Sequence, residues 1–298
     1  MIAEPPSTPD RLPITGRTRL VGLLGGDVRY SLSLRLHNRA FDALNLDWAY
    51  LPLPVSSTDP NRLKEAILGL RAMNFVGANV TMPFKEQVID CLDEITPAAQ
   101  RMGAVNTILH NEDGRLIGGN TDAAGFIADL DANDVAIAAR RVIVLGAGGA
   151  ARAVTHGLAE RGCAQLVIVN RTEQRAARLA NELTLAFPGQ AVEISPWPAR
   201  AQWSTENALI INCTPVGMAG VRTPSGASSP WPAPIRADQV VADLVYAPVR
   251  TSLLETAASA GAKTLNGVGM LVQQAALSFA WWTDQSPPIS QMMAALEP

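Results

Sequence analysis

The chain has 298 residues, of which 48% are hydrophobic and 17% charged, and its formal net charge is −3. This composition is ordinary for a globular protein and excludes a disordered chain. The length allows two domains with separate cores, and the small negative charge gives no general attraction to nucleic acid or anionic membranes.

The N-terminus and the cysteines indicate the compartment. Residues 1–17 are rich in proline and polar residues, so a flexible tail is expected here rather than a signal peptide. Cys91, Cys163 and Cys213 are odd in number and lack metal-ligand spacing, which favours buried free thiols. No apolar run reaches membrane-spanning length. We expect a cytoplasmic protein that binds no metal, no nucleic acid and no membrane.

Strands and helices alternate along the first half of the chain. Strands are expected at 19–24, 48–53, 76–81, 104–109 and 115–118. Helices are expected at 34–43, 61–73, 85–92 and 122–130. The alternation predicts a mainly parallel sheet, and Asp113-Gly114 predicts a hairpin turn between the last two strands.

The alternation begins again at Arg141. Strands are expected at 142–145, 166–169, 208–211 and 240–245. Helices are expected at 152–161, 173–186, 252–260 and 268–283. A segment rich in Pro, Ser and Gly, residues 220–234, is predicted to be a mobile loop.

The segment RVIVLGAGG (141–149) combines a buried strand with a glycine-rich turn, and an alanine-rich helix follows it. Glycine lets the backbone turn tightly and approach a pyrophosphate, and the helix N-terminus offers free N–H groups. The strand, turn and helix in this order are typical of a dinucleotide-binding fold.

The end of the second strand in this half indicates which dinucleotide binds. It carries Asn170-Arg171-Thr172 and no acidic residue, with Arg175 one turn further on. An acid at this position binds the 2′-hydroxyl of NAD, whereas an arginine pairs with the 2′-phosphate of NADP. The sequence therefore favours NADP, although Arg171 could also be an ordinary surface arginine.

Two charged residues in the first half suggest proton transfer. Lys85 follows the strand that ends in NVTMPF, and Asp122 begins the helix expected to connect the two halves. Taken singly, Lys85 is an exposed helix charge and Asp122 an N-cap. If they converge on a cleft they form the base and its partner that oxidation of a secondary alcohol by a nicotinamide requires.

Nine segments in order resemble the shikimate dehydrogenase family, which includes the quinate/shikimate dehydrogenases, across about residues 19–279. They are SLS with HN (31–33, 37–38), NVTMPFKE (79–86), AVNT (104–107), GNTDAAGF (119–126), VLGAGGAARA (144–153), NRT (170–172), NCTPVGM (212–218), DLVYAPVRT (243–251) and GVGMLVQQA (267–275). The resemblance implies an enzyme of aromatic amino-acid biosynthesis that reversibly reduces 3-dehydroshikimate to shikimate with NADPH.

The resemblance also implies the domain plan. Residues 18–123 with 266–298 are expected to form an N-terminal α/β substrate domain with a mainly parallel sheet. Residues 124–265 are expected to form a C-terminal Rossmann-type NADP-binding domain, and the active site is expected in the cleft between the two. The partners would be a shikimate-like cyclic hydroxy acid and the cofactor, in a monomer or a homodimer.

Site residues follow from the resemblance, position by position. Lys85 and Asp122 match the catalytic pair. The substrate-binding set comprises Ser31, Ser33, Asn79, Thr81, Asn106, Tyr246 and Gln274. The cofactor-binding set comprises Gly146, Ala147, Gly148, Gly149, Ala150, Asn170, Arg171, Thr172, Thr214, Leu244, Gly267 and Met270. Met270 and Leu271 could equally be core residues.

The chain departs from the family before the first serine. The family pattern G-x-P-I-x-H-S-x-S-P reads GGDVRYSLSL (25–34) here, so both prolines and the histidine are replaced. The serines remain, but shikimate, quinate and an amino analogue all stay open as substrates. A nucleotide-binding sensor without activity is the alternative from another class, and the presence of both Lys85 and Asp122 speaks against it.

Other residues receive structural interpretations. His37, His110 and His156 have no catalytic partner at useful spacing. Trp281 and Trp282 are interpreted as anchors of the last long helix rather than as ligand contacts.

Overall fold

The computed structural model describes residues 14–56, 59, 61–138, 140–221 and 228–297. Residues 1–13 of the predicted tail and residues 222–227 of the predicted loop therefore lie outside the described residues. The chain divides into two compact units. Unit 1 comprises Met1–Ala99, Val105–Gly119 and Ala275–Pro298, and unit 2 comprises Gln100–Ala104 and Asn120–Gln274.

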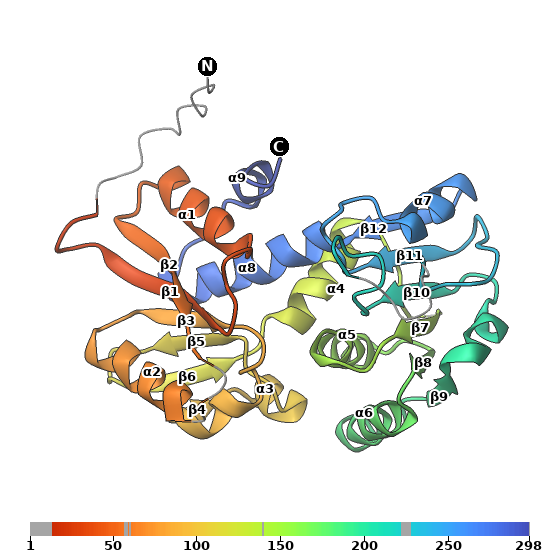
Figure 1. The fold of residues 1–298 in the computed structure, drawn as a ribbon, viewed down its shortest axis with the longest axis horizontal. Helices are drawn as coiled ribbons and strands as arrows, with labels where there is room; N and C mark the ends of the chain where they lie inside the picture. The colour runs from red at the N-terminus through yellow and green to blue at the C-terminus, as the bar shows by residue number, and fades with distance from the viewer. Residues whose placement is uncertain (1–13, 57–58, 60, 139, 222–227, 298) are drawn as a thin grey trace. The chain divides into compact units, whose positions relative to one another are not determined.

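Unit 1 is built on a six-stranded sheet in the order β2-β1-β3-β5-β6-β4 (Figure 1). The strands are β1 (Arg19–Gly25), β2 (Trp48–Pro54), β3 (Gly77–Val80), β4 (Glu94–Ile95), β5 (Thr107–His110) and β6 (Leu116–Gly119). Three pairs are parallel and two, both involving β5, are antiparallel, which confirms the mainly parallel sheet. The predicted hairpin joins β5 to β6, with Gly114 at a φ of 77°.

Helices cover both faces of this sheet. They are α1 (Ser33–Ala43), α2 (Asn61–Ala72), the 3₁₀ helix η1 (Gln87–Cys91), the second half of α8 (Gly267–Thr283) and α9 (Ile289–Ala294). On one face, Leu63, Ile67 and Leu70 of α2 pack against strand residues such as Val80. Their spacing of three and four residues gives α2 the apolar stripe that the sequence predicts.

Aromatic side chains fill the other face of unit 1. Phe41 of α1 lies 5.4 Å, between ring centroids, from both Trp48 and Phe279 of α8. Trp282 donates its indole N–H to the Ile108 carbonyl at 2.9 Å. A Cβ on Gly119 would lie 2.7 Å from the ring of Trp281. Both tryptophans thus anchor α8 on the sheet, as expected.

Unit 2 contains a six-stranded, fully parallel sheet in the order β12-β11-β10-β7-β8-β9. The strands are β7 (Arg141–Leu145), β8 (Gln165–Asn170), β9 (Val192–Pro196), β10 (Leu209–Asn212), β11 (Val240–Asp243) and β12 (Lys263–Asn266). Its helices are α3 (Pro97–Met102), whose first residues lie in unit 1, α4 (Asp122–Ala132), α5 (Gly149–Glu160), α6 (Glu173–Ala186), η2 (Trp197–Trp203), α7 (Ser252–Ser259) and the first half of α8. This is the expected Rossmann-type arrangement.

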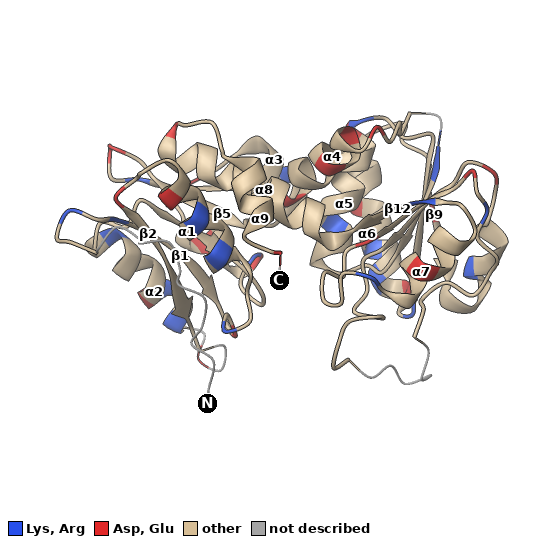
Figure 2. Cartoon of the chain, turned by 90° about the horizontal axis from the view of Figure 1, so that it is seen from above, with Lys and Arg blue, Asp and Glu red and all other residues tan. Residues whose placement is uncertain are grey.

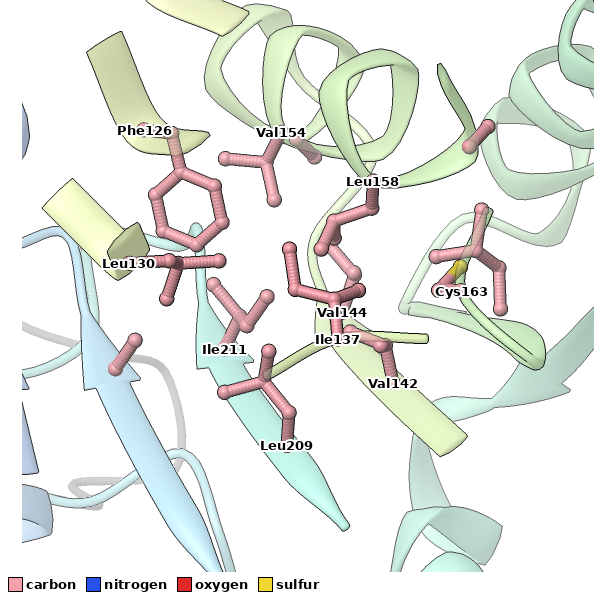
Figure 3. Close-up of a cluster of buried hydrophobic side chains, with 14 of the residues drawn as sticks. Phe126, Leu130, Ile137, Val142, Val144, Val154, Leu158, Cys163, Leu209 and Ile211 are labelled. Atoms are coloured by element: carbon pink, nitrogen blue, oxygen red, sulfur yellow. The ribbon is translucent and has the colours of Figure 1, made fainter. Parts of the chain in front are cut away.

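Alternate residues of each strand in unit 2 face opposite layers. Val142 and Val144 face α4 and α5, where they meet Phe126, Leu130 and Val154 (Figure 3). The intervening Ile143 and Leu145 face α7 and η2. Burial on both faces explains why β7 reads as an unbroken run of β-branched and aliphatic residues.

The sequence pattern does not predict the short elements and those at the periphery of the sheets. The strands β4, β9 and β12 and the helices α3, η2 and α9 are absent from the prediction. The edge strands β9 and β12 bury one residue each, so neither produces an apolar run or a strict alternation. The helices α3 and α9 have six residues each, which is too few for a helical period to emerge.

The helix expected over residues 85–92 is wrong. Lys85 lies in a turn, and only Gln87–Cys91 is helical, as the 3₁₀ helix η1. The carbonyl of Lys85 accepts the Val105 N–H at 2.8 Å, and the Ile89 N–H donates to the Glu86 carbonyl at 3.4 Å, the spacing of a 3₁₀ helix, instead of to Lys85. A partner far away in the sequence therefore overrides the local helical preference.

Charged residues of both signs are interspersed along each unit (Figure 2). This distribution matches the small net charge. Among the described helices, none combines the length and the apolar character that crossing a membrane requires.

Candidate active site

One edge of the unit 1 sheet gathers the predicted substrate-binding residues of that unit and Lys85 of the predicted catalytic pair. In register, Leu24 pairs with Val80, and Thr107 pairs with both Asn79 and Gly119. The carboxyl ends of β1, β3 and β6 therefore lie beside the amino end of β5. The residues that this edge positions are Ser31, Ser33, Asn79, Thr81, Lys85 and Asn106.

Backbone hydrogen bonds fix Lys85 relative to this edge. The Lys85 carbonyl accepts from Val105, and the next residue, Asn106, donates its N–H to the Gly119 carbonyl at 3.0 Å and accepts the Val80 N–H at 2.8 Å. Thr81 also donates its N–H to the Leu24 carbonyl at 2.9 Å. The lysine backbone is thus tied to the segment that carries Asn106 instead of being free on a helix.

A buried polar network lies behind the same edge. The Tyr50 hydroxyl donates to Oδ1 of Asn79 at 2.8 Å. The Asn79 amide donates to the hydroxyls of Thr107 and Ser278, at 3.0 Å each, and to the Asn106 carbonyl at 3.1 Å. Thr107 in turn donates to Oδ1 of Asn106 at 2.8 Å. The network fixes the orientation of two of the predicted substrate-binding amides.

The aromatic residues behind this network are held in their neutral forms. Burial raises the pKa of Tyr50 well above its usual value, against a smaller opposing effect from a hydrogen bond with Ser33. His37 stacks on Tyr50 with ring centroids 4.4 Å apart, and burial lowers its pKa to about 3. His37 is therefore an uncharged packing residue, in line with its structural interpretation.

The two serines lie two residues apart where the segment after β1 leads into α1. The Ser33 N–H donates to the Ser31 hydroxyl oxygen at 3.3 Å, and Ser33 begins α1 with its side chain buried. Two hydroxyls held this close can both donate to one carboxylate. Just before them, Tyr30 is 81% exposed and Arg29 forms an ion pair with Asp27 at 2.8 Å.

In unit 2, five parallel strands end in register. Val169 pairs with Leu145, Leu145 with Asn212, Asn212 with Asp243, and Asp243 with Asn266. In doubly wound sheets, ligands bind beyond the carboxyl ends of the strands, where the strand order reverses. Of the predicted cofactor residues, Gly146, Leu244 and Gly267 directly follow three of these ends, Asn170 is the last residue of β8, and Thr214 lies two residues after β10.

The glycine-rich turn fits a pyrophosphate. Gly146 has a φ of 112°, which favours glycine, and Gly148 is the N-cap of α5 with no side chain capping the helix. Cβ atoms added to Gly148 or Gly149 would have no protein atom within 4 Å. Gly148, Gly149 and Ala150 are also exposed. The turn therefore leaves an open cradle at the helix N-terminus, where an anion is favoured.

The end of β8 carries an exposed cation. The Asn170 amide donates to the Thr172 carbonyl at 2.9 Å, which shapes the loop, and Arg171 and Thr172 are exposed. Within the described ranges, no ion pair or hydrogen bond engages the Arg171 guanidinium. This residue set fits the 2′-phosphate of NADP, because a guanidinium can bind a phosphate through two hydrogen bonds.

A buried carboxylate joins the loops after β10 and β11. Asp243 accepts hydrogen bonds from the Asn212 amide at 2.9 Å, the Thr251 hydroxyl at 2.7 Å and the Val245 N–H at 3.1 Å. Asn212 also accepts the N–H and hydroxyl of Thr214. Burial raises the pKa of Asp243, and the three hydrogen bonds oppose that shift. The network thus fixes the loop that carries Thr214.

The remaining residues of the predicted cofactor set lie where two backbone segments are in close contact. A Cβ on Gly267 would lie 2.2 Å from the Leu244 carbonyl oxygen, and one on Gly146 would lie 3.3 Å from the Thr214 side chain. Met270 and Leu244 pack, partly buried, against the main core of unit 2. Met270 therefore makes the contacts expected of a core residue. It also lies three residues after Gly267, at the same sheet edge as the other predicted cofactor residues.

The other predicted residues lie in unit 2. Asp122 is the first residue of α4 and is buried, whereas the N-cap position is taken by Thr121, so the N-cap interpretation of Asp122 is wrong. Its N–H donates to Oδ1 of Asn120 at 2.9 Å. Gln274 donates its amide to the Leu271 carbonyl at 2.8 Å, and Tyr246 is half-buried.

The thiols and the other histidines offer no further chemistry. Burial is the largest cause that raises the pKa of all three thiols, to about 11 for Cys163. His156 is buried and its pKa is lowered to about 4, chiefly by burial. Over the described part of the chain, no group of three His, Cys, Asp or Glu residues could hold a metal ion.

Two surface cavities lie away from these edges. One, of about 650 Å³, is lined by Arg141 and Gln165, the first residues of β7 and β8. The other, of about 640 Å³, is lined by Arg19, the first residue of β1. Both therefore lie at the amino ends of strands, and neither is lined by a predicted site residue.

Several residues that shape these edges were not singled out from the sequence. Asn212, Asp243 and Thr251 stand inside motifs that carry the family resemblance, so the motifs could have identified them. Tyr50 and Ser278 stand in no such motif. Their hydrogen bonds to Asn79 depend on pairing between distant segments, which no local pattern reveals.

Comparisons with known proteins agree on one family. Three family models match: "Shikimate dehydrogenase substrate binding domain" over residues 23–108, "Shikimate / quinate 5-dehydrogenase" over 129–214 and "Shikimate 5'-dehydrogenase C-terminal domain" over 267–297. The chain is 42% identical over 283 residues to shikimate dehydrogenase (NADP(+)) of Carboxydothermus hydrogenoformans, which covers 95% of this chain and 98% of that protein. It is 44% identical over 289 residues to the same enzyme of Salinibacter ruber, with 96% and 99% covered. A crystal structure of a shikimate dehydrogenase in complex with NADP+ superposes with a TM-score of 0.87 at 37% identity, over 97% of this chain and 98% of that one.

Proposed function

Because the chain belongs to the shikimate dehydrogenase family, we propose that it catalyses the reversible reduction of 3-dehydroshikimate to shikimate with NADPH. The observation that carries this proposal is the in-register edge of unit 2, where an open glycine cradle and the exposed Arg171 suit NADP. In unit 1 the hydroxyls and amides that suit a polyhydroxylated ring acid share one sheet edge.

In the proposed mechanism, residues of the chain move the proton. When bound, NADPH supplies the hydride that reduces the carbonyl carbon. Lys85 gives a proton to the carbonyl oxygen as it becomes a hydroxyl, and in the oxidative direction Lys85 takes that proton back. We propose that Asp122 supports Lys85 in this transfer. Ser31 and Ser33 bind the carboxylate, while Asn79, Thr81, Asn106, Tyr246 and Gln274 bind or line the ring.

The proton-transfer role is tested by replacing Lys85. We expect Lys85→Ala to lower kcat by a factor of about 10² to 10⁴ while the Kd for NADP+, measured by calorimetry, stays within about threefold. Lys64→Ala, which removes an exposed lysine of α2, is the matched control and should retain full activity. Turnover at the wild-type rate in Lys85→Ala would refute the assignment.

A double-mutant cycle tests the partnership with Asp122. If the two residues act on one proton, Lys85→Ala combined with Asp122→Asn should lose little more activity than Lys85→Ala alone. Additive losses would show that Asp122 acts independently of Lys85.

The choice of acid is tested by steady-state kinetics with shikimate, quinate and an amino analogue, each with NADP+ and NAD+. We expect the highest kcat/KM for shikimate with NADP+. The replaced residues before Ser31 make quinate the main rival, and a higher kcat/KM for quinate would favour a quinate dehydrogenase. Tight NADP+ binding without oxidation of any acid would favour a sensor.

The domain roles, the compartment and the assembly state belong to the same proposal. We assign substrate binding to residues 18–123 with 266–298, and NADP binding to residues 124–265. Three unpaired cysteines suit a reducing cytoplasm. The expected assembly is a monomer or a homodimer, and light scattering of the purified protein distinguishes the two.

A further inference from the structure

The helices α4 and α8 lie side by side (Figure 1), and at two contact points a glycine of one helix meets the other helix. At the first point, a Cβ on Gly125 of α4 would lie 2.6 Å from the backbone nitrogen of Gln274 in α8. At the second, a Cβ on Gly269 of α8 would lie 2.0 Å from Oδ1 of Asp129 in α4. No other residue type fits at either glycine without displacing its neighbour, so the two helices have one closely determined packing.

Asp129 holds the beginning of α8 at the second contact point. Its carboxylate is buried against the backbone of Gly269, where a Cβ would lie 2.0 Å from Oδ1, and Asn133 of the same helix donates to Oδ1 at 3.2 Å. Burial raises the pKa of Asp129 to about 6, and the nearby backbone N–H of Met270 opposes that shift. A carboxylate beside the first turn of a 17-residue helix also interacts favourably with the helix dipole.

Two other donors in the first turn of α8 have partners close by in the sequence or in the next loop. Gly267 donates its N–H to the Val245 carbonyl at 3.3 Å, and Val268 donates to Oδ1 of Asn266 at 3.0 Å. Asp129 differs because it reaches this turn from another helix. It therefore couples the position of α8 to that of α4.

This coupling connects residues to which the proposed function gives roles. Asp122 lies at the start of α4, two turns before Asp129. On α8, Met270 directly follows Gly269, which lies against the carboxylate, and Gln274 follows one turn later, against Gly125. A shift of α8 along α4 would move Met270 and Gln274 together relative to Asp122.

We infer that Asp129 is a positioning residue for the reaction: by holding the first turn of α8 against α4, it sets Met270 for the cofactor and Gln274 for the substrate. The inference rests on the proposed function for the roles of these two residues. The proposed function gives Asp129 no contact with either ligand. Its removal should therefore weaken binding more than it slows the chemical step.

The first test compares three variants of α4. We expect Asp129→Ala to raise the KM for shikimate and the Kd for NADP+ by about tenfold or more, with kcat within about threefold of wild type. Asp129→Asn keeps an oxygen that can accept the Met270 N–H, so both constants should stay within about threefold of wild type. Asp131→Ala removes an exposed carboxylate of the same helix and is the matched control.

The second test separates positioning from a loss of stability. Gln274→Ala is combined with Asp129→Ala, and the KM for shikimate is measured in the four proteins. If Asp129 acts through Gln274, its effect on KM should shrink in the Gln274→Ala background, whereas a purely structural effect would be additive. Thermal unfolding of each variant shows that the measured proteins are folded.

Either of two results would overturn the inference: wild-type KM and Kd in folded Asp129→Ala, or equal losses in Asp129→Ala and Asp129→Asn. If Asp129→Ala does not fold, Gly269→Ala replaces it, because its Cβ would displace the Asp129 carboxylate, and wild-type KM and Kd in folded Gly269→Ala would then refute the inference. A wild-type protein that fails to oxidise shikimate would defeat the proposed function instead, and the Kd for NADP+ would still test the role of Asp129.

Discussion

The hydroxyl of Tyr50 on β2 donates a hydrogen bond to Oδ1 of Asn79 on β3, at 2.8 Å, although β1 lies between these two strands in the sheet. Both side chains are buried. The bond leaves the Asn79 amide group to donate toward Asn106, Thr107 and Ser278, so it determines which way the Asn79 side chain is oriented. A residue outside every recognisable motif thereby controls one that the proposed function uses.

Removing this hydroxyl should affect both stability and substrate binding. Tyr50→Phe leaves Oδ1 of Asn79 buried without its donor, which costs about 1–3 kcal/mol of unfolding free energy. We also expect a higher KM for shikimate with a smaller change in kcat. Urea unfolding and steady-state kinetics measure the two effects. The exposed Tyr30 supplies the control Tyr30→Phe for stability, and equal stability of the two variants would contradict the prediction.

Much of the fold could be predicted from the sequence because the central strands are buried on both faces. The helix α6 has the predicted bounds, and β7 differs by one residue, since each is marked by a long apolar pattern. The edge strands and the six-residue helices lack such a pattern. The error at Lys85 has another origin, a hydrogen bond between its carbonyl and Val105 that joins segments 20 residues apart.

The candidate site was predictable only where chemistry and motif coincide. The glycines after β7 and the Asn170-Arg171 pair could be interpreted from strand order alone, because parallel strands present their carboxyl ends at one edge. Asp129 and Ser278 could not. Each acts through a contact between segments distant in sequence, and an aspartate or a serine on a helix is unremarkable until that contact is known.

The cofactor preference should depend on Arg171. Removing its guanidinium eliminates a charge-assisted contact worth about 1.5–3 kcal/mol, so Arg171→Ala should raise the KM for NADP+ by about tenfold to a hundredfold. The KM for NAD+ should change little, because NAD+ lacks the 2′-phosphate. The control is Arg161→Ala, which removes an exposed arginine paired with Asp131. Parallel losses with both cofactors would argue against a contact with the 2′-phosphate.

Buried His37 should make the protein sensitive to acid. Its pKa is lowered from 6.5 to about 3 in the folded protein, so below pH 6.5 the unfolded chain binds one proton more than the folded chain. The contribution of His37 to the free energy of unfolding is fully present above pH 6.5. It falls by about 1.4 kcal/mol per pH unit as the pH decreases toward 3. His37→Phe, which keeps a ring against Tyr50, should remove this part of the slope. Urea unfolding between pH 7 and pH 4.5 measures it, and an unchanged slope in the variant would contradict the burial argument.

Substituting alanine at two glycines of unit 2 should affect two different properties: NADP+ binding at Gly148 and stability at Gly267. Gly148 has a φ of −97°, which alanine adopts, and an added Cβ meets no protein atom within 4 Å, so Gly148→Ala should keep the wild-type Tm. Its methyl group would instead occupy the open cradle and raise the Kd for NADP+ by about tenfold or more. Gly267→Ala places a Cβ 2.2 Å from the Leu244 carbonyl oxygen and should lower the stability by about 1–3 kcal/mol.

Thermal unfolding and calorimetric titration with NADP+ distinguish these two effects. Gly16→Ala is the control for both, because its Cβ also meets no atom within 4 Å and Gly16 lies in unit 1, outside the predicted site. If Gly148→Ala binds NADP+ as tightly as the wild type, the pyrophosphate does not lie against this turn. The cofactor would then have to approach the sheet edge elsewhere, and the role assigned to the end of β7 would be wrong.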